Sequence, residues 1–206
     1  MKNNRDPQRT RARILEAATE EFSRFGLGGA RVDRIATRSG ANKRMLYYYF
    51  GSKEKLFLAA LEGSYAQIRS AERALDLVHL DPRSALRRLV EFTWIYFLEH
   101  PEFLTLLNSE NLHKGRHVRR SRRVREMHSP LVGTLRAILR RGEREGLFRR
   151  GVDPVQLYIS IAGEGYFYLS NRYTLSRIFD RDLMTRRALA SRVRHNAAMI
   201  LNALRR

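Results

Sequence analysis

The stretch VDRIATRSGANKRMLYYYFGSK, residues 32–53, decides the fold. Val32, Ile35 and Ala36 recur at the i, i+3, i+4 spacing of one helical face, which predicts a short helix. Gly40 follows this helix, and because glycine readily takes a positive φ, we expect a tight turn there. These residues therefore predict a short helix that ends in a sharp turn.

A second helix is predicted directly after this turn. Asn42 can cap it with its side-chain carbonyl, and Leu46 and Phe50 lie four residues apart on its inner face. Gly51 then interrupts the helix, and Ser52 can cap the next one. Two short helices joined by a glycine-containing turn constitute a helix-turn-helix, whose second helix can lie in the major groove of DNA.

The residues before this motif predict one more helix, so that the small domain has three helices in all. Ile14, Ala18, Phe22 and Phe25 recur at i, i+4, i+8 and i+11, so they form one apolar stripe. Gly26 can end this helix in a left-handed cap.

The outer side of the second motif helix combines cations with phenols. Cations can reach base acceptors or phosphates, and phenolic hydroxyls can bond phosphate oxygens. The residues expected on this side are Lys43, Arg44, Met45, Tyr47 and Tyr48. Lys53 and the free N–H groups at the start of the next helix would add a second phosphate contact.

This pattern resembles the TetR family of bacterial transcriptional regulators over about residues 9–58. The matching residues are Ile14-Leu15-Glu16-Ala17-Ala18, Phe22, Gly26, Val32, Ile35-Ala36, Gly40, Lys43, Leu46-Tyr47, Phe50 and Ser52-Lys53-Glu54. The resemblance implies that residues 43–45 face base edges, that Tyr47 and Lys53 clamp the DNA backbone, and that residues 48 and 49 often contact DNA. The predicted DNA-contacting set is Arg31, Asn42, Lys43, Arg44, Met45, Tyr47, Tyr48, Tyr49 and Lys53.

Two positions depart from the family pattern. Most members have Thr or Ser where this chain has Arg31, so the phosphate contact is expected to persist without the side-chain cap. The residue after Lys43 is usually small, but here Arg44 is long enough to read guanine through O6 and N7.

The resemblance also implies a homodimer that responds to a small molecule. A ligand among the helices behind the motif would tilt the helix that follows it and change the spacing of the two recognition helices, which suits half-sites about 34–36 Å apart. The last two long helices should pair across a two-fold axis, although packing within one chain can use the same side chains. The candidate interface residues are Val155, Ile159, Ile161, Ala162, Ala197, Ile200, Leu201 and Leu204.

Downstream of the motif the chain is predicted to consist of longer helices. Helical periodicity covers about residues 53–78, 83–99, 101–111, 121–145, 153–173 and 184–204. Pro82, Pro101 and Pro154 fit the starts of three of them. The prediction is an all-α protein of about nine helices, with a helix-turn-helix domain over residues 1–53 and a helical ligand-binding and dimerisation domain over residues 54–206.

The composition favours a nucleic acid as partner. The 40 Lys and Arg residues outnumber the 21 Asp and Glu residues, giving a net charge of +19 that is concentrated in residues 1–53 and 112–151. No apolar run approaches the ~20 residues of a bilayer span, and the amino terminus is not that of a secretion signal. Cysteine is absent, which excludes disulfides and thiolate metal sites. We therefore expect a cytoplasmic protein, nucleoid-associated when bound to DNA, with no membrane partner.

The candidate effector site is a set of aromatic and polar residues. Aromatic side chains are frequent between residues 92 and 168, which is the composition of a pocket or of a plain core. Glu164 interrupts an apolar run and needs an ionic partner or a polar cavity. The residues at the end of the helix near 111 either cap it or bind a ligand. The predicted ligand-binding set is Trp94, Phe97, Asn108, Asn111, His113, Glu164 and Phe167.

A run of basic residues permits several interpretations: a solvated face, a further nucleic-acid contact or a funnel for an anionic ligand. It consists of Lys114, Arg116, Arg119, Arg120, Arg122, Arg123 and Arg125. His113 and His117 are four apart, but Gly115 lies between them and no partner ligand follows, so neither a metal nor a cofactor is predicted.

The motifs predict a regulator and no enzyme, because no nucleophile elbow, acid/base pair or cysteine nucleophile is recognised. The expected function is that of a sequence-specific repressor which a small molecule releases from a palindromic operator, an arrangement implied by the family resemblance. The alternative is a nonspecific or architectural DNA-binding protein, which the net charge alone would also fit.

Overall fold

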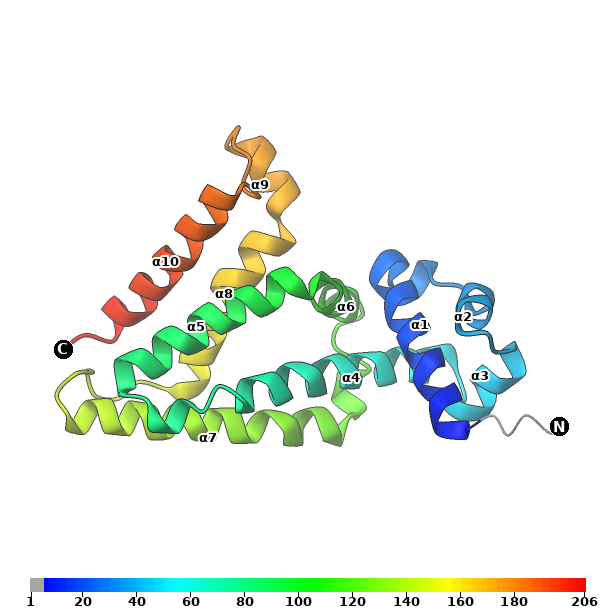
Figure 1. Cartoon of the computed structure of the whole chain (residues 1–206), viewed down its shortest axis with the longest axis horizontal. Helices are drawn as coiled ribbons and strands as arrows, with labels where there is room; N and C mark the ends of the chain where they lie inside the picture. The colour runs from blue at the N-terminus through cyan, green and yellow to red at the C-terminus, as the bar shows by residue number, and fades with distance from the viewer. Residues whose placement is uncertain (1–5) are drawn as a thin grey trace. The chain divides into compact units, whose positions relative to one another are not determined.

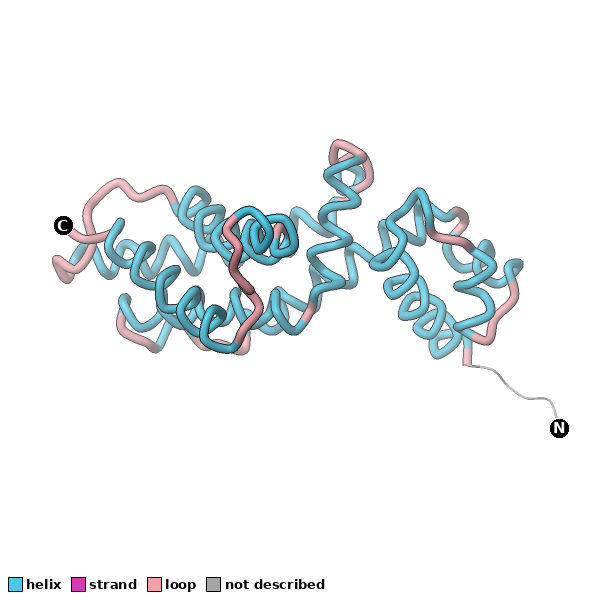
Figure 2. The backbone as a smooth tube through the Cα atoms, turned by 90° about the horizontal axis from the view of Figure 1, so that it is seen from above, coloured by secondary structure: helices cyan, strands magenta, loops and turns pink. Residues whose placement is uncertain are grey.

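The computed structural model describes residues 6–206 and confirms the all-α prediction. Helices and the loops between them make up this part of the chain (Figure 2). Residues 1–5, which belong to the predicted DNA-binding domain and to the stretch assessed for a secretion signal, lie outside the described residues.

Ten α-helices and two short 3-10 helices follow one another along the described chain (Figure 1). They are α1 (Pro7–Gly29), α2 (Val32–Ser39), α3 (Lys43–Phe50), α4 (Lys53–Arg73), η1 (Leu77–His79), α5 (Pro82–Glu99), α6 (Pro101–Leu112), η2 (Val118–Arg120), α7 (Arg122–Arg144), α8 (Pro154–Ser170), α9 (Arg172–Ile178) and α10 (Arg186–Ala203). The three prolines begin α5, α6 and α8, as predicted. The short helix α9 was not predicted, because it is only about two turns long and none of its residues is buried, so it carries no apolar periodicity.

The described chain divides into two compact units. The first combines the residues up to Gln67 with Pro101–Arg125, and the second combines Ile68–His100 with Glu126–Arg206. Helices α4 and α7 therefore contribute residues to both. The domain boundary predicted after residue 53 falls inside the first unit. As a boundary between a DNA-binding part and a ligand-binding part, it stays a prediction.

The first unit is built on an apolar core shared by α1, α2, α3, α6 and the first turns of α4. Phe22 and Phe57 meet edge to face, with ring centroids 5.2 Å apart. Burial of a large apolar side chain contributes about 1.5–3 kcal/mol, so a core of this size holds the motif helices in place. Its buried members include Ile14, Ala18, Phe22, Ile35, Leu46, Phe50, Leu56, Phe57, Leu61 and Leu106.

The end of α1 differs from the prediction. Gly26 has a positive φ of 62°, but its ψ of 179° is extended, so it kinks the helix rather than capping it, and the helical turns resume as far as Gly29. Phe25 is 43% exposed and lies outside the buried stripe, and the Arg34 guanidinium stacks over its ring at 4.2 Å. Leu27 is buried in its place, and its N–H donates to Ser109 Oγ at 3.1 Å.

In the second unit α5, α8 and α10 pack against one another, with the apolar side of α7 completing the core. Four of the residues proposed for a dimer interface, Ile161, Ala197, Ile200 and Leu204, are buried in this core. For these four the intramolecular alternative holds, since packing within the chain already covers them.

Candidate nucleic-acid interface

The start of α2 is held by a buried acid from α1. Arg31 occupies the N-cap position and makes no side-chain cap, as expected from the departure at this position. Glu21 replaces the cap: its Oε1 accepts from the Arg31 N–H at 2.9 Å and from Arg34 Nε at 2.6 Å. The Glu21 side chain is only 1% exposed, so α2 is anchored to α1 through a charge-assisted, buried contact.

The turn between α2 and α3 confirms the glycine prediction. Gly40 adopts a left-handed conformation, with φ 60° and ψ 26°. The N–H groups of Gly40 and Ala41 donate to the carbonyls of Thr37 and Ala36, which ends α2 and redirects the chain.

Helix α3 has the two faces that the sequence predicts. Asn42 caps it by accepting from the Met45 N–H at 2.9 Å. Leu46 and Phe50 are buried, whereas Tyr47 and Tyr48 are 48% and 81% exposed. An inner apolar face therefore fixes the helix while its outer face stays open.

The outer face of α3 carries the predicted cations. Lys43 and Arg44 are exposed, whereas Met45 and Tyr49 are half-buried and pack against the core, so Met45 is less open than predicted. The Tyr49 ring meets that of Tyr48 edge to face, at a centroid distance of 5.2 Å. Their contacts with DNA stay predictions.

Lys43 and Lys53 are held by neighbours of the same unit. Lys43 Nζ lies 2.5 Å from Asp33 Oδ1 on α2, and both side chains are more than half exposed. Lys53 Nζ donates to the Gly28 carbonyl at 3.5 Å. Ser52 caps α4, as predicted, because its Oγ accepts from the Lys55 N–H at 3.1 Å. Pairs this exposed are worth at most about 1 kcal/mol, so a phosphate can displace these partners.

The predicted effector residues do not gather at one site. Trp94 and Phe97 are buried in the second unit against Gly165, where a Cβ would meet Phe97 at 3.2 Å. Glu164 pairs with Arg192 at 2.5 Å. Phe167 is 59% exposed.

Three polar members of that set, Asn108, Asn111 and His113, lie in the first unit. Asn111 Nδ2 donates to the Leu107 carbonyl at 2.9 Å, and His113 Nδ1 lies 2.7 Å from the Ser109 carbonyl oxygen. These local contacts at the end of α6 match the capping alternative. Asn108 is half-buried on the same helix. None of the seven predicted residues lines the cavity described next, and their role in ligand binding stays a prediction.

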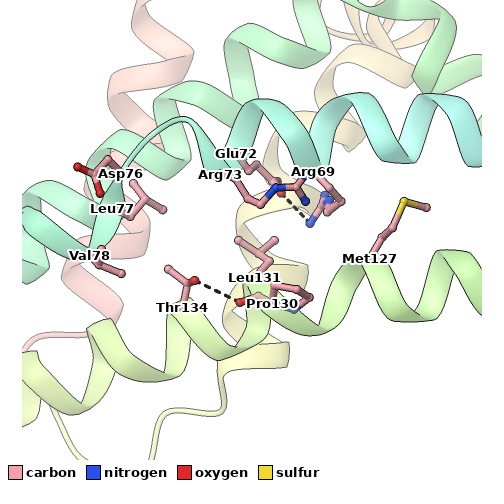
Figure 3. A pocket seen from close by; sticks show the side chains of 10 residues that line it. All are labelled: Arg69, Glu72, Arg73, Asp76, Leu77, Val78, Met127, Pro130, Leu131 and Thr134. Carbon is pink, nitrogen blue, oxygen red and sulfur yellow. Dashed lines mark hydrogen bonds and ion pairs between the residues drawn. The ribbon is translucent and has the colours of Figure 1, made fainter.

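A cavity of about 140 Å³ opens in the second unit between the end of α4, η1 and α7 (Figure 3). It is lined by Arg69, Glu72, Arg73, Asp76, Leu77, Val78, Met127, Pro130, Leu131 and Thr134. Sequence reasoning missed this site. The available signal was Glu72, which falls four residues after the buried Ile68 and so occupies the apolar side of α4.

An incompletely bonded ion pair forms the polar wall of this cavity. Arg69 Nη1 lies 2.9 Å from Glu72 Oε2, and the two side chains are 2% and 3% exposed. Arg69 Nη2 donates to the Tyr158 hydroxyl at 2.8 Å. Arg69 Nε and both Glu72 oxygens have no hydrogen-bond partner among the described residues. Desolvation raises the pKa of Glu72 to about 7, against the opposing charges of Arg69 and Arg73.

Over residues 6–206, no group of three or more His, Asp or Glu side chains is arranged to hold a metal ion. In the same residues, none of the helices combines the length and apolar character needed to cross a bilayer.

Known proteins match this chain along most of its length. Residues 14–60 match bacterial regulatory proteins of the tetR family, and residues 82–200 match the tetracyclin repressor-like C-terminal domain. The HTH-type transcriptional repressor NicS of Pseudomonas putida is 46% identical over 198 residues, which cover 96% of this chain and 93% of NicS.

Solved structures show the same fold. The transcriptional regulator SCO4942 from Streptomyces coelicolor has a TM-score of 0.69 and 25% identity, covering 95% of this chain and 98% of that one. FadR from Bacillus subtilis, in complex with stearoyl-CoA, has a TM-score of 0.68 and 15% identity, covering 94% and 99%. With a helix-turn-helix in the matching position, the protein is a sequence-specific DNA-binding transcriptional regulator and not an enzyme. The chain belongs to the TetR family of bacterial regulatory proteins.

Proposed function

We propose that the protein is a homodimeric repressor that binds a palindromic operator and is released from it by a small molecule. The observation that carries this proposal is the outer face of α3, where exposed Lys43, Arg44, Tyr47 and Tyr48 stand on a helix fixed by Leu46 and Phe50. Four side chains of this kind can combine base readout with backbone clamping. The 46% identity with the repressor NicS supports repression as the sign of regulation.

Dimerisation through α8 and α10 is supported by apolar side chains that the chain leaves exposed. Val155 and Ile159 on α8 are 44% and 54% exposed, and they belong to the interface proposed from the sequence. Phe167 on α8 and Met199 on α10 are 59% and 45% exposed. Large exposed apolar residues on two adjacent helices are typical of a subunit interface, and a two-fold pairing would bury them.

The effector would occupy the cavity beside Arg69 and Glu72. An apolar cavity of about 150 Å³ can hold a benzene ring, so a volume of 140 Å³ fits a ligand of about one ring. The unpaired Arg69 Nε offers a donor and the Glu72 oxygens offer acceptors. Donors and acceptors side by side favour a neutral ligand with an adjacent carbonyl and N–H over a simple anion.

Coupling to DNA would run along α4. This helix begins at Lys53, in the predicted DNA-contacting set, and ends at Arg73, in the cavity wall. A ligand that binds the cavity in only one position of α4 would shift the population toward that position, and thereby change the affinity for DNA.

The first experiment selects genomic DNA fragments with the purified protein and then measures binding of the selected fragment and of a scrambled control at physiological salt. We expect a palindromic fragment, a stoichiometry of two chains per site, and an affinity at least about 10³-fold above the control. Equal affinity for both duplexes, with a steep salt dependence, would instead identify a nonspecific DNA-binding protein that binds through electrostatics.

The effector site is tested by thermal-shift screening of single-ring lactams and amides, followed by release of the selected DNA. A hit should lose its effect in the double variant Arg69→Met, Glu72→Leu, which replaces the ion pair with apolar groups of similar size. The variant Glu91→Gln serves as control, because that carboxylate is exposed on α5 and does not line the cavity. A hit that releases DNA equally well from the double variant would place the effector elsewhere.

A further inference from the structure

The basic run between α6 and α7 belongs to the same compact unit as the helix-turn-helix. We name it the basic strip; it comprises Lys114, Arg116, Arg119, Arg120, Arg122, Arg123 and Arg125, all exposed. Residues 111–125 contain no acidic side chain. The strip is therefore a dense positive surface inside the DNA-binding unit, although it lies more than sixty residues beyond the motif in sequence.

Contacts along α4 fix where the strip lies. Near the start of α4, the charge of Arg116 makes a small contribution to lowering the pKa of Glu54. About two turns further on, Ser121 Oγ donates to Glu62 Oε1 at 2.6 Å, and Arg123 Nη1 lies 3.8 Å from Glu62 Oε2. The α6–α7 connection therefore runs beside the first turns of α4 (Figure 1).

The strip rests on a rigid, buried base. Glu110 at the end of α6 accepts from the N–H groups of His117 and Val118 at 2.8 and 2.9 Å, and from His117 Nδ1 at 2.6 Å. The His117 ring meets Phe57 of α4 edge to face at 5.3 Å. Because this base is buried and fully bonded, the exposed cations above it are held at a fixed place on the unit.

The start of α4 carries a negative charge beside a predicted phosphate contact. The pKa of Glu54 is lowered by a hydrogen bond from its own backbone and one from the Ser52 side chain. The positive charges of Lys53 and Arg116 lower it further. A charged carboxylate at the predicted phosphate contact opposes DNA. Lys53 and Arg116 oppose this negative charge at the start of α4.

We propose that the basic strip contacts the DNA backbone beside the operator and forms a second, sequence-independent grip next to Lys53. Arg116, whose charge reaches Glu54 at the start of α4, and its neighbours Lys114, Arg119 and Arg120 are expected to meet flanking phosphates first. Such contacts strengthen binding to every sequence and carry no base preference. The inference rests on the proposed DNA binding and deepens it.

The test compares two variants with the same loss of charge. Lys114→Gln, Arg119→Gln, Arg120→Gln neutralises the strip, whereas Arg136→Gln, Arg140→Gln, Arg144→Gln neutralises three exposed arginines of α7 in the second unit. Each is measured by the slope of log Kd against log salt, on the selected operator alone and on the operator extended by about one helical turn (10 bp) at each end. Thermal melts confirm that both variants fold.

The strip variant should lower the salt slope by roughly 2–3 per protomer, because each lost phosphate contact removes about 0.9. Extension of the duplex should strengthen binding of the wild type and of the α7 variant, but not of the strip variant. The ratio of operator to scrambled affinity should stay unchanged in the strip variant.

Equal slopes for the two variants would overturn the inference, as would a strip variant that binds DNA normally and loses only its response to an effector. The latter outcome would make the strip a funnel for an anionic ligand. Failure to find any preferred operator would count against the proposed function alone, because the slopes of both variants can still be compared on random duplex.

Discussion

Glu110 in the first unit and Glu72 in the second are both buried carboxylates on helices, yet their surroundings differ. Glu110 accepts three hydrogen bonds from the His117 backbone, the Val118 backbone and the His117 ring. Glu72 forms an ion pair with Arg69, but neither of its oxygens has a hydrogen-bond partner among the described residues. A satisfied buried acid fixes a backbone, whereas an unsatisfied one beside a cavity keeps bonding capacity for a ligand.

The largest effect should come from breaking the satisfied network. Glu110→Ala leaves three donors unpaired in the interior, so we expect a loss of about 3–5 kcal/mol in the free energy of unfolding. Urea unfolding measures it. Glu91→Ala on the exposed side of α5 is the control and should stay within about 0.5 kcal/mol of wild type. A loss below about 1 kcal/mol for Glu110→Ala would mean that water takes over the Glu110 bonds.

Glu72, the acid without a hydrogen-bond partner, should instead make the free energy of unfolding depend on pH. Burial raises the pKa of Glu72 from its ordinary value of 4.5 to about 7, so between these values the folded chain binds more protons than the unfolded chain. Its contribution to stability is therefore complete below pH 4.5 and is lost as pH rises to about 7, by roughly 3 kcal/mol. Glu72→Gln removes this pH dependence.

Unfolding of the wild type and of Glu72→Gln at pH 5 and pH 8 checks this sign. At pH 8 the free energy of unfolding should be higher for the variant than for the wild type. At pH 5 this advantage should disappear. Parallel curves for the two proteins would show that Glu72 stays charged throughout, through water in the cavity or movement of Arg73.

A third buried acid lies between these two cases, because Glu21 Oε1 accepts two hydrogen bonds whereas its Oε2 has no hydrogen-bond partner among the described residues. Glu21→Gln keeps an acceptor for the Arg31 N–H but loses the charge that meets Arg34 at 2.6 Å. We expect a loss of about 1.5–3 kcal/mol, because hydrogen bonds to charged groups are worth that much. Amide hydrogen exchange at the start of α2 should rise in parallel. Unchanged protection at Arg31 would show that the core alone places α2.

Sequence reasoning reached the DNA-binding elements because their signals are local. Gly40, Asn42 and Ser52 act on backbone groups within four residues, so the turn and both caps followed from spacing alone. The stripe on α1 failed at Phe25, where a cation from α2 covers the ring. A contact with a residue nine positions away on another helix leaves no periodic signal.

The cavity could not be derived in the same way. Arg69 on α4 and the α7 residues that line the cavity are distant in sequence, and only the folded chain brings them together. The aromatic residues that composition marked for ligand binding, Trp94 and Phe97, are core residues against Gly165. Composition indicates how much apolar surface must be buried but does not say which residues leave a space.

The smallest effect concerns an exposed acid of the first unit. Asp33 holds Lys43 at 2.5 Å while both side chains stay more than half exposed, so Asp33→Asn should change stability by less than about 0.5 kcal/mol. DNA affinity should rise a few-fold at low salt, because Lys43 becomes free and one negative charge leaves the α3 surface, and the gain should fade as salt increases. Glu145→Gln, an equal charge change at an exposed site of the second unit, should leave the affinity almost unchanged. If Asp33→Asn weakens binding instead, the pair orients Lys43 for its contact, and an exposed ion pair then plays in the DNA complex the positioning role that Glu21 and Glu110 play in the core.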